Sequence, residues 1–201
     1  MGGADMVEYD GRTALVVVDV QNDFADPDGS LYVHGGQEIL PVVNAEIERA
    51  RDAGALVVYS QDWHPPSTPH FRKDGGVWPV HCVGDTWGSE LLPGLLVVEG
   101  ERIRKGTGGE DGYSAFSVRD PASGETAPTR LERALREHGV ERVIVAGIAT
   151  DYCVVESVLD AGRLGFETVV IGGGIRAVDL EPGDGERAVE RMRDAGARFV
   201  D

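Results

Sequence analysis

Residues 142–165, RVIVAGIATDYCVVESVLDAGRLG, determine the fold that this chain is expected to adopt. The stretch opens with an apolar, β-branched run, Arg142–Gly147, which is typical of a buried strand. A helical pattern follows over Asp151–Leu164, and Gly165 stands where a glycine commonly ends a helix. A strand that passes directly into a helix predicts a βαβ unit and therefore a parallel sheet.

The same alternation of strand and helix extends to both sides of this unit. Most of the strand patterns lack polar alternation, so both faces of the sheet should be buried. We expect an α/β fold in one domain over residues 1–201: a three-layer αβα sandwich with a mainly parallel six-stranded sheet of Rossmann-like topology. The predicted strands are Ala14–Val20, Ala55–Ser60, Glu101–Arg104, Arg142–Gly147, Glu167–Ile171 and Ala197–Val200, and the predicted helices are Gln37–Ala53, Thr129–His138, Asp151–Leu164 and Glu186–Ala195.

Two long stretches, residues 62–96 and 105–128, interrupt this alternation. Irregular segments of that length are usually functional or disordered. The first contains all three tryptophans and three of the five histidines, a composition too aromatic for a flexible linker. We therefore expect it to carry function. The run Gly172–Gly174 lacks the spacing of a nucleotide-binding loop and predicts a tight turn.

The composition excludes several classes of partner. The 201 residues carry 19 Lys and Arg against 35 Asp and Glu, and a formal charge of −16 repels nucleic acids and anionic membrane surfaces. No apolar run approaches the roughly 20 residues of a membrane helix. The two cysteines, Cys82 and Cys153, do not form a disulfide framework, and the N-terminus has no targeting signal. We expect a cytoplasmic protein, with a homo-oligomer left open.

Cys153 lies in the first turn of the predicted helix Asp151–Leu164. Thr150 or Asp151 can cap that helix, and the free amides and dipole at a helix N-terminus stabilise a thiolate. Such a position lowers a thiol pKa from about 8.5 to between about 3.5 and 7.5, which makes a cysteine nucleophilic. The alternative is a small buried hydrophobic residue, because free cysteines are among the most buried residues.

Asp19 and Lys105 stand at the ends of predicted strands, where a parallel sheet places its active site. A carboxylate in a buried strand is costly unless it is paired or used, so packing explains Asp19 poorly. Lys105 closes the third strand, and by itself it could be a solvated lysine. A cation beside Asp19 and Cys153 would instead keep the carboxylate ionised and stabilise the thiolate.

The first long stretch contains four residues of the types that bind metals. Asp62 and His64 are separated by one residue and point to the same side of an extended segment, while His81 and His70 follow in the same loop. One carboxylate with imidazoles and no thiolate favours Zn²⁺ or Fe²⁺ with an open coordination position. A hydrogen-bonded Asp–His pair without a metal is the alternative.

Taken together, these motifs resemble those of the isochorismatase-like cysteine hydrolases. They follow the order of that superfamily from residue 14 to about residue 160. Because the chain has both the cysteine motif and the metal-loop motifs, it most resembles the nicotinamidases within it, also called pyrazinamidases. The motifs are Asp19-Val-Gln-Asn-Asp-Phe, Asp62-Trp-His64-Pro, Trp78-Pro-Val-His81-Cys, Lys105-Gly and Gly147-Ile-Ala-Thr-Asp-Tyr-Cys153-Val.

The resemblance implies a role for each candidate residue. The triad would be Asp19, Lys105 and Cys153, and the oxyanion hole would be the backbone N–H groups of Ala149 and Cys153. The metal ligands would be Asp62, His64 and His81, with His70 as a further candidate. The substrate ring would contact Phe24, Trp78 and Tyr113, together with Ile148, which a cis peptide bond would join to Ala149.

The implied activity is hydrolysis of a small amide, nicotinamide and also pyrazinamide, to the acid and ammonia through a thioester, a reaction of NAD salvage. Tyr152 departs from relatives that carry His beside the nucleophile. Three alternatives remain open: another isochorismatase-like amide hydrolase, a metal-hydroxide hydrolase in which Cys153 is not the nucleophile, and a non-catalytic binding or assembly module.

Overall fold

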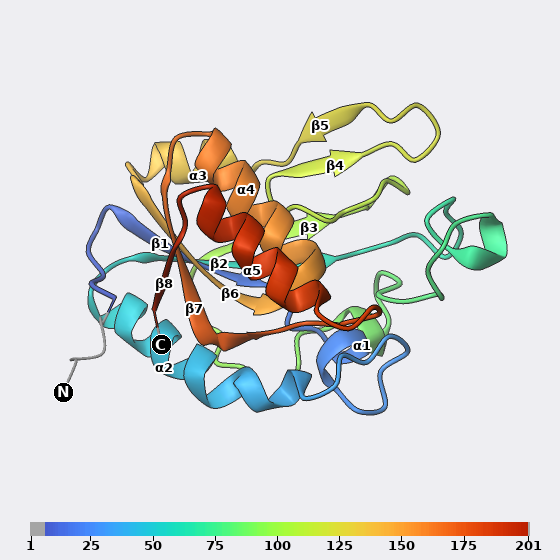
Figure 1. Ribbon diagram of the computed structural model, residues 1–201, viewed down its shortest axis with the longest axis horizontal. Coiled ribbons are helices and arrows are strands. Elements are labelled where there is room, and N and C mark those ends of the chain that lie inside the picture. Colours follow the sequence, from blue (N-terminus) through green and yellow to red (C-terminus); the bar gives the residue numbers. More distant parts are fainter. Residues whose placement is uncertain (1–6, 201) are drawn as a thin grey trace.

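A six-stranded sheet forms the centre of the computed structural model, which describes residues 7–200 (Figure 1). The strands lie in the order β3-β2-β1-β6-β7-β8, and every neighbouring pair is parallel. Their bounds are β1 Thr13–Val18, β2 Leu56–Asp62, β3 Glu101–Lys105, β6 Arg142–Ile148, β7 Glu167–Arg176 and β8 Arg198–Val200.

The central strand β1 explains why the sheet needs cover on both faces. All six of its residues are buried, and Val16 pairs with Val58 on β2 and with Val145 on β6. Successive side chains point to opposite faces, so Leu15 belongs to one hydrophobic core and Val16 to the other. Complete burial of a Val or Leu side chain contributes about 1.5–3 kcal/mol, so both cores stabilise this strand.

Helices occupy both faces of the sheet, as the sequence predicts. Helix α2 (Leu40–Asp52) packs Ile47 into the core that contains Leu15. Helices α3 (Leu131–Glu137), α4 (Val155–Arg163) and α5 (Asp184–Asp194) cover the other face. Figure 1 shows α2 on one side of the sheet and α3, α4 and α5 together on the opposite side. The three-layer αβα architecture is therefore confirmed.

Several element boundaries differ from the prediction. The predicted helix Gln37–Ala53 is divided into a 3₁₀ turn, Gly36–Ile39, followed by α2. The predicted helix Asp151–Leu164 begins as a π-helical turn, Thr150–Val154, and becomes α4 only at Val155. The glycines predicted to follow the four helices all have positive φ, as helix-ending glycines do.

The predicted tight turn at Gly172–Gly174 is wrong. Strand β7 continues through these glycines to Arg176, and its pairing with β6 shifts between Val145 and Gly147. Glycines inside a strand often mark such irregular pairing, because they allow close approach of a neighbour. A Cβ on Gly174 would lie 3.3 Å from the Cβ of Ala146 on β6.

The two long stretches contain short elements that the sequence pattern did not indicate. The hairpin of β4 (Ser117–Arg119) and β5 (Thr126–Pro128) projects from the second stretch. The short helix α1 (Asn22–Ala25) follows β1 and lies beside the 3₁₀ turn Trp87–Ser89 of the first stretch. The first stretch is thus held beside α1, whereas the β4–β5 hairpin extends away from the sheet (Figure 1).

The strand order places a topological switch point between β1 and β6. From β1 the chain proceeds to β2 and β3, whereas from β6 it proceeds to β7 and β8 on the other side. The carboxyl ends of adjacent strands that lead in opposite directions form a crevice, where open α/β sheets bind ligands. Asp19 follows β1, and Ala149 follows β6.

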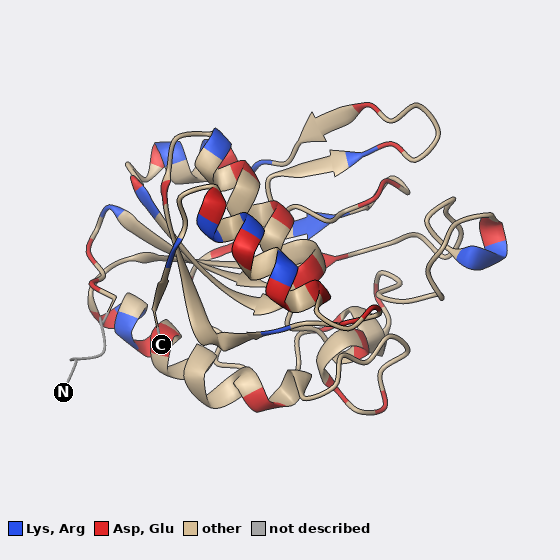
Figure 2. Cartoon of the chain, in the orientation of Figure 1, with Lys and Arg blue, Asp and Glu red and all other residues tan. Residues whose placement is uncertain are grey.

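Charged residues lie mainly on the outer surface. Figure 2 shows acidic and basic residues interspersed along α4 and α5, while the buried sheet is largely uncharged apart from β3. Within residues 7–200, no helix is both long and apolar enough to cross a membrane.

Candidate active site

Asp19 lies buried at the carboxyl edge of the sheet and accepts two strong hydrogen bonds. Its backbone leaves β1 with φ +48°, a conformation uncommon for a residue other than glycine. One carboxylate oxygen accepts from Lys105 Nζ at 2.7 Å and the other from Ser60 Oγ at 2.6 Å. Burial raises the pKa of Asp19, although Lys105 acts in the opposite direction. A carboxyl group with a raised pKa is suited to accept and return a proton.

Lys105 is completely buried and lies between two carboxylates. Besides Asp19, its ammonium lies 3.0 Å from Asp62 Oδ1 and donates to the carbonyl of Gly112. Burial opposes the charge, but the two carboxylates raise the pKa of Lys105 well above its usual range. The ammonium is therefore charged: it donates to Asp19 and to the Gly112 carbonyl, and it forms an ion pair with Asp62. The alternative of a solvated lysine at the end of the strand is wrong.

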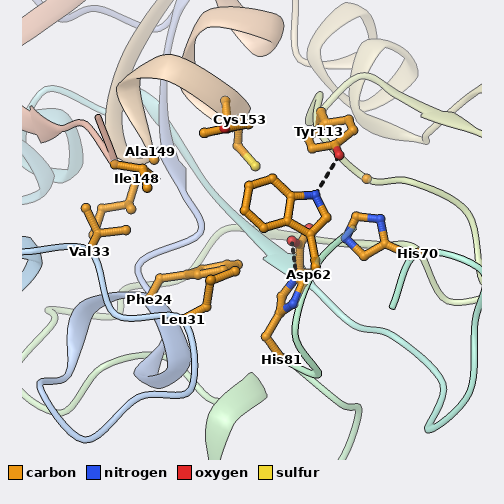
Figure 3. A pocket seen from close by; sticks show the side chains of 14 residues that line it. Phe24, Leu31, Val33, Asp62, His70, His81, Tyr113, Ile148, Ala149 and Cys153 are labelled. Carbon is orange, nitrogen blue, oxygen red and sulfur yellow. Dashed lines mark hydrogen bonds and ion pairs between the residues drawn. The ribbon is translucent and has the colours of Figure 1, made fainter. Parts of the chain in front are cut away.

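Cys153 lies across from this ion pair on the π-helical turn that follows β6. It is 7% exposed, and its sulfur and the carboxylates of Asp19 and Asp62 lie within 4.8 Å of one another. Figure 3 shows the Cys153 sulfur pointing into the pocket. The peptide bond between Ile148 and Ala149 is cis, as the family resemblance implies. The three proposed triad residues thus meet, although they come from three different strand ends.

The expected electrostatic environment of Cys153 is wrong in two respects. The turn is preceded by Ala149 and has no side-chain cap, because the Asp151 carboxylate instead accepts from the backbone N–H groups of Val178 and Asp179. Burial raises the pKa of the Cys153 thiol well above its usual range, against the opposing effect of Lys105. Since a thiol dominates at neutral pH, a nucleophilic thiolate requires a base.

Three histidines from the first long stretch form a cluster next to the triad. The ring nitrogens of His64, His70 and His81 lie within 4.8 Å of one another, and all three residues are buried. Asp62 Oδ2 lies 3.8 Å from His64 Nε2 and 4.0 Å from His81 Nε2. Neighbouring tetrahedral ligands with bonds of about 2.0–2.2 Å lie about 3.3–3.6 Å apart, so shifts of a few tenths of an ångström would bring these atoms onto one ion.

The hydrogen bonds of these histidines fit a metal site. Neither ring nitrogen of His64 has a hydrogen-bond partner among the described residues, although His64 is only 1% exposed. Leaving such a group unsatisfied costs about 1–3 kcal/mol. The Nδ1 atoms of His70 and His81 lie 2.6 Å from Asp111 Oδ1 and 2.7 Å from the Pro79 carbonyl oxygen, which leaves both Nε2 atoms available. Such outer contacts commonly orient metal-bound histidines.

His70 and His81 are also neutral, as metal ligands must be. Burial lowers the pKa of His81 to about 4 and lowers that of His70, although Asp62 and Asp111 oppose the change. The Lys105 ammonium lowers the pKa of Asp62 against the effect of its burial, so this residue is a carboxylate. Neutral imidazoles with one carboxylate are a suitable donor set for Zn²⁺ or Fe²⁺.

A pocket of about 460 Å³, including the space that opens to solvent, separates Cys153 from the histidines (Figure 3). Its size is that of a small-molecule site. The walls are mostly aromatic and aliphatic. Trp78 Nε1 donates to the Tyr113 hydroxyl at 2.8 Å, and the ring of Phe24 lies 5.5 Å from that of His81. The lining includes Phe24, Asp62, His70, Trp78, His81, Tyr113, Ile148, Ala149 and Cys153.

The sequence patterns did not single out two contributors to this site, Ser60 and Asp111, and they identified Tyr152 only as a departure from relatives that carry His. Ser60 donates to Asp19. Because Ser60 pairs with Val18 in the register of β1 and β2, a correct prediction of that register would have placed Ser60 beside Asp19. Asp111 contacts His70 from 41 positions away along the chain, and no spacing rule predicts that contact. Tyr152 lines the pocket, with its ring 5.0 Å from that of Trp78.

The same architecture occurs in proteins of known sequence and structure. The isochorismatase domain family model matches residues 13–201. A nicotinamidase of Escherichia coli (strain K12) is 37% identical over 206 residues, which cover 92% of each chain. A crystal structure of a pyrazinamidase of Pyrococcus horikoshii in complex with zinc has a TM-score of 0.84 and 38% identity, covering 94% of this chain and 99% of that one. A crystal structure of a protein from L. infantum in complex with nicotinate has a TM-score of 0.87 and 34% identity, covering 97% and 96%.

These similarities extend over nearly the full length of both chains in each comparison, and the first two relatives exceed 35% identity. The resemblance drawn from the motifs is therefore confirmed. The chain belongs to the isochorismatase family, and several of the relatives to which it is similar there are nicotinamidases.

Proposed function

We propose that this protein is a nicotinamidase, which hydrolyses nicotinamide, and also pyrazinamide, to the corresponding acid and ammonia. The observation that carries the proposal is the meeting of Asp19, Lys105 and Cys153 beside a pocket that Cys153 lines together with two members of the buried histidine cluster, His70 and His81. A nucleophile with its base and a substrate-sized aromatic pocket are the parts that amide hydrolysis through a covalent intermediate requires.

Asp19 begins the reaction by taking the proton of the Cys153 thiol. The sulfur attacks the amide carbon, a carbon–sulfur bond forms, and the carbonyl oxygen becomes an oxyanion. Asp19 then delivers its proton to the nitrogen, the carbon–nitrogen bond breaks and ammonia leaves. In the second half, Asp19 takes a proton from water as the water attacks the thioester, the carbon–sulfur bond breaks, and Asp19 returns the proton to the sulfur, which releases the acid and restores the thiol.

Two further groups stabilise charge during these steps. The backbone N–H groups of Ala149 and Cys153 face the oxyanion, and each donor of this kind contributes about 10²–10³ in rate. Lys105 keeps its charge throughout, because its buried ammonium is surrounded by Asp19, Asp62 and the Gly112 carbonyl. It therefore compensates the negative charge that passes between the sulfur and Asp19.

Asp62, His64, His70 and His81 would hold one divalent ion, Zn²⁺ or Fe²⁺. When bound, the ion supplies a Lewis-acid position to which the ring nitrogen of the substrate can bind. Phe24, Trp78 and Tyr113 confine the ring between them, so that the carboxamide faces Cys153. Holding the reacting groups in this orientation contributes to the rate by reducing the entropy lost in the transition state.

An ammonia-release assay with nicotinamide and pyrazinamide, combined with metal analysis of the same sample, tests the proposal. We expect turnover of both amides, and a nicotinoyl adduct on Cys153 in acid-quenched samples analysed by mass spectrometry. Cys153→Ala should abolish turnover while the metal content stays unchanged. Cys82→Ala is the matched control, because the Cys82 side chain is completely buried in the hydrophobic core and does not line the pocket.

The same variants separate the proposal from its alternatives. Turnover that survives Cys153→Ala would favour a metal-generated hydroxide as the nucleophile. Metal-replete wild-type protein without activity on any small amide would favour a binding or assembly module.

A further inference from the structure

Two loops from different parts of the chain meet at His70. Asp111 Oδ1, from the segment after β3, lies 2.6 Å from His70 Nδ1, and the side chains of Asp111 and His70 are 14% and 4% exposed. Two residues before His70, Thr68 Oγ1 donates to the Gly109 carbonyl at 2.6 Å. Two side-chain hydrogen bonds thus connect the histidine loop to residues 109–111.

The backbone of Asp111 is itself anchored. Its N–H donates to the Arg119 carbonyl at 2.8 Å, and the Arg119 N–H donates to the Asp111 carbonyl at 2.9 Å. Arg119 belongs to β4, which pairs with β5 in an antiparallel hairpin. The backbone of Asp111 therefore extends that hairpin, and from this anchored position its carboxylate reaches His70.

The contact determines which nitrogen of His70 is free. A carboxylate only accepts hydrogen bonds, so the neutral ring of His70 carries its proton on Nδ1 and has its lone pair on Nε2. The ring stacks on that of His64 with centroids 4.6 Å apart, within the cluster of three histidines. Asp111 thus fixes both the tautomer and the rotation of His70.

We propose that Asp111 is a positioning residue that makes His70 a ligand of the divalent ion, so that metal affinity depends on the β4–β5 hairpin. This inference rests on the proposed metal site. It extends that site into the second long stretch, whose residues are absent from the ligand set. Without Asp111, the His70 ring could rotate and exchange its proton between the two nitrogens, and the metal would lose a correctly directed ligand.

The two residues that follow Asp111 also contact the proposed active site. The carbonyl of Gly112 accepts from Lys105, and the Tyr113 hydroxyl accepts from Trp78. Three consecutive residues therefore contact the metal site, the buried ammonium and the pocket wall. Since the backbone of Asp111 is held by Arg119, the hairpin positions all three contacts together.

The test is a measurement of the dissociation constant for Zn²⁺, by competition with a chelating indicator, on the purified full-length chain. The variants are Asp111→Ala, Asp111→Asn, His70→Ala and the double variant. Loss of an outer partner of a metal ligand typically weakens metal binding about 10–100-fold, so we expect this range for Asp111→Ala. Asp111→Asn keeps an acceptor of nearly the same shape but lacks the negative charge that strengthens the hydrogen bond to His70, so it should lose less affinity than Asp111→Ala but still a measurable amount. Glu125→Ala is the control, because it removes one exposed carboxylate from the same hairpin.

The double variant identifies the route of the effect. If Asp111 acts through His70, adding Asp111→Ala to His70→Ala should change the dissociation constant by less than about twofold. An equal loss of affinity with and without His70 would overturn the proposal, as would Asp111→Ala or Asp111→Asn proteins that bind Zn²⁺ as tightly as wild type. A folded, isosteric Asp111→Asn variant keeps the test decisive if the alanine variant does not fold.

Different results would show that the proposed metal site itself, and not only the role of Asp111, is wrong. If wild-type protein binds no divalent ion, or if His64→Ala and Asp62→Ala leave the affinity unchanged, the proposed site itself is wrong. If those two variants lose the metal while Asp111→Ala does not, only the role of Asp111 is wrong.

Discussion

Asp19→Asn is the most informative single substitution, because it removes the proposed base and changes little else. The asparagine oxygen can accept from Lys105, and its NH₂ group can donate to Ser60 Oγ, so both contacts of the carboxylate have replacements. Lys105 keeps its ion pair with Asp62. The variant should therefore fold, and the change in rate reports on proton transfer.

The expected loss follows from the state of the thiol. At the ordinary pKa of about 8.5, about 3% of a thiol is ionised at pH 7, and burial raises the pKa of Cys153 further. Without a base, the shortage of thiolate alone therefore costs at least about 30-fold. Removing a general base typically costs about 10²–10⁴. We expect kcat/KM to fall about 10³-fold, which corresponds to about 4 kcal/mol.

The assay is kcat/KM for nicotinamide between pH 5 and 9, with Asp26→Asn as the control. Asp26 lies near the surface of the same segment, and among residues 7–200 its carboxylate accepts only from the Asp28 N–H. In Asp19→Asn, the rate should rise with pH as the thiol ionises by itself. In wild type, the rate should fall at low pH as Asp19 becomes protonated, at a value above the ordinary 3.9 because burial raises its pKa. An Asp19→Asn protein within tenfold of wild type at pH 7 would refute the assignment of the base.

Three further predictions concern the thiols, the metal and the histidines. Iodoacetamide should alkylate Cys153, which lines the pocket, before it alkylates the completely buried Cys82, and activity should fall in proportion to the labelling of Cys153. If Cys82 were labelled first while activity fell, the assignment of Cys153 as the nucleophile would be wrong. Metal-replete enzyme should strongly prefer nicotinamide over benzamide, which lacks the ring nitrogen, and equal kcat/KM values would return the metal-hydroxide alternative to first place. In metal-free protein, burial lowers the pKa of His81 to about 4, whereas an unfolded histidine titrates near 6.5. The unfolded state therefore binds more protons between these values, so the urea midpoint should fall as the pH drops from about 6.5 to about 4; a constant midpoint would show that His81 is not buried as a neutral ring.

The sequence predicts the layers of the fold better than the ends of its elements. Strands such as β1 are continuous apolar runs because both faces are buried, and such runs are visible in any sequence. Gly172–Gly174 shows the limit of this reasoning. Glycine is common both in turns and in irregular strands, and only the pairing with β6 shows that β7 continues.

The candidate site shows the same division between local and non-local information. Asp19, Asp62 and Lys105 could be placed at one sheet edge, because each follows or ends a predicted parallel strand. The pKa of Cys153 could not be predicted, because the motif reveals a helix N-terminus but not burial of the thiol beside two carboxylates. The contact between Asp111 and His70 lies beyond pattern analysis, since it joins two loops without regular periodicity.

The charges at the sheet edge explain why the triad and the histidine cluster are adjacent. Asp19 and Asp62 are both within 3.0 Å of the single ammonium of Lys105, so three buried charged groups together have an excess of one negative charge. Buried charge is costly unless it is compensated. Asp62 also faces His64 and His81, where a divalent cation would balance its charge and leave Lys105 to interact mainly with Asp19. Through Asp62, one carboxylate therefore links the proposed metal site to the ion pair of the proposed base, although the two sites use otherwise separate residues.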